Sequence, residues 1–85
     1  MLREIGGAAE ISAARADVRR LAADLDPEVS LSAELVASEL MTNAILHGGG
    51  SGRLQVTRTA TGGLRIGVAD NERRAPIVGV SVGVV

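Results

Sequence analysis

The chain has 85 residues, and its nine basic and ten acidic side chains give a formal net charge of −1. This length supports a single domain. Because the net charge is near zero and neither sign forms a long run, we expect no binding of nucleic acid or of an anionic membrane. The absence of cysteine excludes disulfide frameworks and cysteine-based zinc or redox sites. All nine basic residues are arginines, so the lysine of a P-loop or of a eukaryotic-type kinase core is missing.

We expect residues 1–9 to form a flexible N-terminus. The N-terminus lacks the basic stretch and apolar segment of a secretory signal, and the absence of cysteine makes the cytoplasm the expected location. The core must be built from aliphatic side chains and two methionines, because the chain contains no Phe, Tyr or Trp. We therefore expect a thin core.

Two helices are predicted next. Apolar residues recur at spacings of three and four over residues 10–25, which is the pattern of an amphipathic helix. Asp26 and Pro27 then favour a stop and a restart, with Asp26 as the N-cap and Pro27 in the first turn. The second helix is expected over residues 28–47 and should end at the glycine-rich segment 48–52.

Strands follow the second helix. Apolar residues alternate with polar or small ones around residues 54–56 and again over 64–68, and the connection 60–63 predicts an antiparallel hairpin. Residues 71–74 are predicted to form a loop and residues 77–85 a last strand. The fold class predicted is α/β (α+β), a two-layer sandwich of helices on a mostly antiparallel sheet within one domain, 1–85.

Polar residues form a stripe on the second predicted helix. Glu39, Asn43 and His47 fall within about 80° of one another around the helix axis. Leu35 and Leu46 flank this stripe on one side, and Val36 and Leu40 lie at its other edge. We therefore expect the acid and the amide to lie amid apolar surface and to need partners. The alternatives are a solvated polar face for Glu39 and Asn43, and a cap on the helix C-terminus for His47.

Asp70 continues the inward row of the second hairpin strand, because it has the same parity as Ile66 and Val68. A carboxylate that closes an apolar row indicates a ligand, a buried water or the mouth of a cavity, although Asp also often begins a turn. We expect Glu39, Asn43 and Asp70 to converge between sheet and helix.

Two segments resemble a known family. Residues 38–48, SELMTNAILHG, resemble the N box of GHKL (Bergerat-fold, histidine-kinase-like) ATPases in the version of bacterial anti-sigma-factor serine kinases. Residues 68–76, VADNERRAP, are similar to the G1 box of that family. The resemblance implies a partial Bergerat fold that binds ATP and Mg²⁺. It implies that Glu39 is the general base, that Asn43 holds Mg²⁺ on the phosphates and that Asp70 accepts the adenine amino group, with His47 as a further candidate nucleotide contact.

Departures from the family pattern are also present. Glu72 stands where the G1 box often has glycine or serine, and the segment 79–83 does not match the glycine-rich G2 box that cradles phosphate. The glycine run 48–52 follows a helix and lacks a following Lys-Ser/Thr, which favours a linker over a phosphate loop. The expectation is an incomplete ATP-binding domain.

Two functions are compatible with these residues. The first is an ATP-binding protein related to anti-sigma-factor kinases, which, if active, would be an ATP-dependent protein serine/threonine kinase with a sigma factor and an anti-anti-sigma factor as partners. The second is a truncated, inactive fragment that serves as a protein-interaction module through its first helix or an exposed strand edge. Dimerisation with a second copy stays open.

Overall fold

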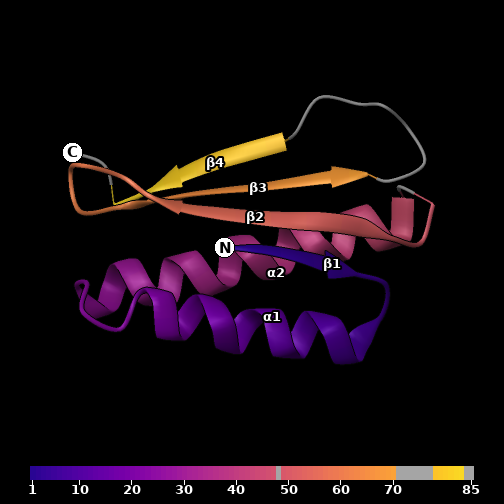
Figure 1. The fold of residues 1–85 in the computed structure, drawn as a ribbon, viewed down its shortest axis with the longest axis horizontal. Helices are drawn as coiled ribbons and strands as arrows, with labels where there is room; N and C mark the ends of the chain where they lie inside the picture. The colour runs from indigo at the N-terminus through magenta and orange to yellow at the C-terminus, as the bar shows by residue number, and fades with distance from the viewer. Residues whose placement is uncertain (48, 71–77, 84–85) are drawn as a thin grey trace.

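Two helices lie on one face of a four-stranded antiparallel sheet in the computed structural model, which describes residues 1–47, 49–70 and 78–83 (Figure 1). In chain order the elements are β1 (Leu2–Ile5), α1 (Ala8–Leu21), α2 (Pro27–His47), β2 (Gly52–Arg58), β3 (Leu64–Asp70) and β4 (Val78–Val82). The strands follow one another in the order β1-β2-β3-β4, and every neighbouring pair is antiparallel. The predicted α+β sandwich and its hairpin are confirmed.

The N-terminal segment differs from the prediction. Residues 1–9 were expected to be flexible, but Leu2–Ile5 forms β1 and pairs with β2. Ile5 is buried at 2% exposure, and the N-terminal amino group of Met1 donates a hydrogen bond to the Val56 carbonyl oxygen at 2.8 Å. The ladder to β2 satisfies backbone groups that the short sequence of β1 cannot satisfy alone, so a tertiary contact orders this segment.

The helix boundaries follow from local chemistry. The backbone N–H of Glu28 donates to Asp26 Oδ1 at 2.9 Å, so Asp26 caps α2 as predicted. The first helix starts earlier and ends earlier than expected, at Ala8 and Leu21. The chain then turns, with the Leu25 N–H bound to the Ala22 carbonyl oxygen at 3.0 Å. Helix propensity favours a continuation of α1 beyond Leu21, whereas the observed turn allows α2 to pack against α1.

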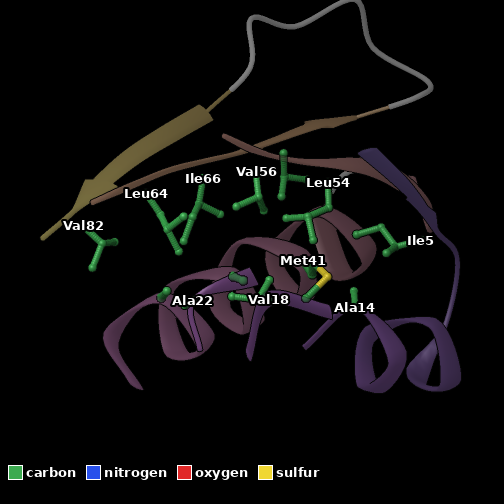
Figure 2. Packing of buried hydrophobic residues seen from close by; sticks show 13 residues of the cluster. Ile5, Ala14, Val18, Ala22, Met41, Leu54, Val56, Leu64, Ile66 and Val82 are labelled. Atoms are coloured by element: carbon green, nitrogen blue, oxygen red, sulfur yellow. The ribbon is translucent and has the colours of Figure 1, made fainter. Parts of the chain in front are cut away.

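The core lies between the sheet and the helices, and Figure 2 shows its aliphatic side chains meeting there. Its sheet side consists of buried residues on the inward face: Ile5, Leu54, Val56, Leu64, Ile66, Val68 and Val82. Its helix side is dominated by small residues: Ala14, Val18, Ala22, Ala33, Ala37 and the longer Met41. The small side chains let both helices approach the sheet closely, and the radius of gyration of 12.1 Å agrees with the value of about 12 Å for a compact domain of this length.

Ion pairs connect the elements at the surface. They join β1 to α1 (Arg3–Asp17), α1 to α2 (Arg19–Glu34), β2 to β1 (Arg53–Glu4) and the end of β2 to the helix connection (Arg58–Asp24). The Arg19 contact has two hydrogen bonds to the Glu34 carboxylate, at 2.8 and 3.1 Å. These hydrogen bonds, more than the charge of Arg19, lower the pKa of Glu34 below its ordinary value.

Among the described helices, α2 is long and apolar enough to meet the length and composition test for a membrane span. One such helix is weak evidence for a membrane span, because a mostly buried core helix of a soluble protein and a signal sequence pass the same test. Here Ala33, Ala37 and Met41 of α2 are fully buried against the rest of the domain. The compact fold is therefore compatible with a soluble protein, and a cytoplasmic location stays a prediction.

Candidate functional site

The polar stripe of α2 faces solvent. Glu39, Asn43 and His47 are all exposed, and no hydrogen bond or ion pair joins them to another described residue. The expectation that this stripe is shielded from solvent is wrong, because the flanking Leu35 and Leu46 are themselves 58% and 68% exposed. The expected apolar surroundings are present at Glu39, which borders an apolar hollow. Since α2 is apolar around most of its circumference, periodicity could not tell which face packs on the sheet. The stripe is thus open to a ligand and needs no internal partner.

Glu39 borders a shallow apolar hollow. Leu35, Val36 and Leu40 of α2 and Val80 of β4 line the rest of this space, which measures about 280 Å³. Among the residues that line it, the Glu39 carboxylate is the one charged group. The volume is slightly below the range of roughly 300–1,000 Å³ that is usual for small-molecule sites. One part of a ligand could therefore contact Glu39 and apolar surface together, with the rest extending along α2.

Asp70 closes β3 next to the C-terminal third of α2. Its backbone pairs with Gly52, and a Cβ at Gly52 would lie 3.3 Å from the Ala44 Cβ. Ala44 follows Asn43 directly, so the end of β3 lies near the turn of α2 that carries Asn43. Glu39 and Asn43 are exposed, so they do not lie between sheet and helix as expected. Val68, two residues before Asp70, is buried on the inward face, which agrees with the expected parity. The side chain of Asp70 lies outside the described part of the structure.

The glycine-rich segment after α2 has the geometry of a turn. Gly49 and Gly50 have φ values of 93° and 90°, the left-handed region in which glycine carries no steric penalty. The segment follows the C-terminus of α2, where the helix dipole places partial negative charge. A phosphate would be repelled there, so the interpretation as a connection holds. Gly48 and residues 71–76 of the G1 segment, including Glu72, lie outside the described residues.

His47 is the last residue of α2 and is exposed. A basic side chain in the last turn interacts favourably with the partial negative charge of the helix C-terminus. This position suits the capping alternative and leaves the ring accessible to a nucleotide as well. Both interpretations of His47, as a cap on the helix C-terminus and as a nucleotide contact, are therefore compatible with the structure.

The described residues contain no group of three or more His, Cys, Asp or Glu side chains that could hold a metal ion by themselves. Asn43 would thus hold Mg²⁺ only together with oxygens of a ligand, which is how Mg²⁺ often binds beside phosphates.

Comparison with family models, with curated proteins and with solved structures gives no match.

Three exposed leucines of α2 were not predicted to form part of this surface. Leu31 is 59% exposed and lies with Leu35 and Leu46 within about 60° around the axis of α2, so the three leucines form an apolar strip beside the polar stripe. Their common face can be found from the sequence by helical spacing. Their exposure could not, because leucine usually marks the buried side of a helix.

Proposed function

We propose that the chain is an adenine-nucleotide-binding module related to anti-sigma-factor serine kinases, with ATP and Mg²⁺ on the face of α2 that carries Glu39 and Asn43. The observation that carries the proposal is the exposed pair of an acid and an amide one turn apart, in the C-terminal half of α2, whose Ala44 lies near the end of β3. The opposite face of α2 packs against the rest of the domain through the buried Ala33 and Ala37. A helix packed in this way is a suitable support for a binding site.

The side chains fit the roles that the resemblance implies. The Asn43 amide oxygen is a hard ligand suited to Mg²⁺ that is also bound to phosphates. The Glu39 carboxylate is suited to accept a proton from a hydroxyl or from water, a contribution typically worth about 10² to 10⁴ in rate. An ionised Asp70 would accept a hydrogen bond from the adenine amino group. In this proposal His47 is a secondary contact, and a sigma factor and an anti-anti-sigma factor are the protein partners.

A second candidate function is supported by the apolar strip of Leu31, Leu35 and Leu46. Exposed leucines beside an apolar hollow are typical of surfaces that contact another protein. The chain would then be a protein-interaction module without turnover, and its contact surface would be α2 rather than the first helix. Nucleotide binding distinguishes the two candidates, because the second needs none.

The proposal is tested by titrating the protein with Mg·ATP while amide chemical shifts are recorded. We expect saturable shifts around Glu39 and Asn43 and at the end of β3. Replacing Asn43 by Ala should weaken binding in Mg²⁺ by roughly tenfold or more, because a ligand to the ion is lost. The matched control is Ser32→Ala, which removes another exposed polar side chain of α2 far from Asn43.

Unchanged spectra at millimolar Mg·ATP would overturn the proposal and leave the interaction module as the better account. Equal weakening by Asn43→Ala and Ser32→Ala would overturn the assignment of Asn43. Both positions are exposed, so neither variant should disturb folding.

A further inference from the structure

The outer face of the sheet carries a second hollow. Both helices cover the opposite face, so side chains on the outer face are open to solvent (Figure 1). In this face Gln55 pairs with Gly67, and Gly67 pairs with Gly79 across three adjacent strands. The two glycines leave a trough of about 230 Å³ that is bordered by Gln55, Thr57 and Arg65.

Arg65 is held along one wall of this trough. Its Nη1 donates a hydrogen bond to Ser81 Oγ at 3.2 Å. Its guanidinium also lies over Gly79, where a Cβ would be 2.8 Å from Nη2 and 3.1 Å from Cζ. The absence of a side chain at Gly79 therefore makes room for the guanidinium, and the Ser81 hydroxyl fixes its direction.

The charge of Arg65 is not neutralised within the described structure. The other arginines of the described strands each contact a carboxylate: Arg3 with Asp17, Arg53 with Glu4 and Arg58 with Asp24. Arg65 instead contacts a neutral hydroxyl, and no acidic residue lines the trough. A guanidinium has five N–H donors, of which this hydrogen bond uses one.

We propose that the trough binds a small oxyanion group, either a phosphate or a carboxylate, through the guanidinium of Arg65. The planar fork of arginine matches two oxygens of such a group, and these charge-assisted hydrogen bonds are the stronger ones in proteins. The Thr57 hydroxyl and the Gln55 amide, both on the border of the trough, supply further donors. The volume suits a single oxyanion group rather than a whole nucleotide.

This site is separate from the proposed nucleotide face. Arg65 and Gly79 lie on the outer side of the sheet, whereas Glu39 lies on a helix that packs against the inner side. Loss of Mg·ATP binding would therefore leave the oxyanion site unaffected, and the reverse also holds. The two proposals fail independently.

The test is a titration of the full chain with inorganic phosphate and, separately, with acetate, at constant ionic strength, followed by amide chemical shifts. We expect saturable shifts at Thr57, Arg65, Gly67 and Gly79 with at least one of the two anions. Stronger binding of phosphate would identify a phosphoryl group as the ligand, and stronger binding of acetate a carboxylate. Arg65→Gln should weaken binding by about tenfold or more, because the charged donor is lost.

Two further variants make the test specific. Gly79→Ala keeps every charge but places a methyl group where the guanidinium lies, so it should also weaken binding. Arg53→Gln removes one positive charge from the same face outside the trough and should leave binding within twofold of the parent. The proposal is overturned if neither anion gives saturable shifts, or if Arg65→Gln and Arg53→Gln have the same effect.

Discussion

Glu39 and Asn43 are both accessible to a ligand. Each is exposed on α2, and neither forms a hydrogen bond or ion pair with another described side chain. A polar residue on the solvent-exposed face of a helix usually serves only to keep that surface hydrated. What distinguishes this pair is the hollow beside Glu39 and the nearby end of β3. Because neither side chain has a hydrogen bond or ion pair within the described structure, both can bind a ligand without any loss of folding stability.

The assigned roles of these two residues predict different effects of substitution. Glu39→Ala should leave the affinity for Mg·ATP within about threefold of the parent, since the residue is placed to accept a proton rather than to bind the nucleotide. Any phosphate release from ATP should fall by about 10² or more, the usual contribution of a general base. Measuring affinity by calorimetry and release by phosphate assay separates the effects. Retention of full turnover by this variant would refute the role of Glu39.

At the scale of elements, α1 and α2 are joined by alanine packing and by the contact between Arg19 and Glu34. The hydrogen bond from Arg19 holds the pKa of Glu34 below its ordinary value of 4.5, whereas burial of the carboxyl group acts to raise that pKa. The unfolded chain then binds a proton more readily than the folded one in this range. The contact therefore stabilises the fold above about pH 4.5 and is lost as the pH falls through the lowered pKa.

This linkage predicts the pH dependence of one variant. Arg19→Gln should be less stable than the parent at neutral pH by a small amount, as is usual for exposed ion pairs. The difference should shrink as the pH falls below about 4.5 and disappear below the lowered pKa, where Glu34 is protonated in the folded parent as well. Urea unfolding at several pH values measures it. Arg15→Gln, an exposed charge on the same helix without a hydrogen bond to Glu34, is the control and should show a weaker trend.

Helices and strands could be predicted from the sequence where their residue pattern extends over many residues. The extent of α2, the Asp26 cap and the alternation in the hairpin of β2 and β3 each depend on local chemistry, and all were confirmed. The strand β1 could not be predicted, because four residues are too short to show a period and its order comes from pairing with β2. The early end of α1 likewise depends on packing rather than on propensity.

The site was predictable only in part. Helical spacing placed Glu39, Asn43 and His47 on one exposed side of α2. Strand parity correctly predicted the inward row of β3 up to Val68, whereas the side chain of Asp70 lies outside the described part of the structure. The environment of the stripe was not predictable, because α2 has apolar residues around most of its circumference and alanines, not leucines, form its buried face. The outer trough depends on the register that brings Gly67 opposite Gly79, which a single sequence does not specify.

At the scale of the whole molecule, the fold is held by a small aliphatic core. No aromatic side chain contributes to it, and several of its members are alanines. A domain of this length typically has a free energy of unfolding of about 4–13 kcal/mol. Binding of a ligand to the native state alone adds directly to that value. A ligand should therefore change the unfolding temperature of this protein by an amount that is easy to measure.

Thermal unfolding with and without Mg·ATP tests the central claim most directly. If the nucleotide binds the folded chain, ATP at 100 times its dissociation constant should add about 2.7 kcal/mol to the stability. For a domain of this size that corresponds to an increase of roughly 10–20 °C in Tm, and the increase should be largely lost in Asn43→Ala. An unchanged Tm at millimolar Mg·ATP, with the protein folded at the start of the scan, would contradict the account.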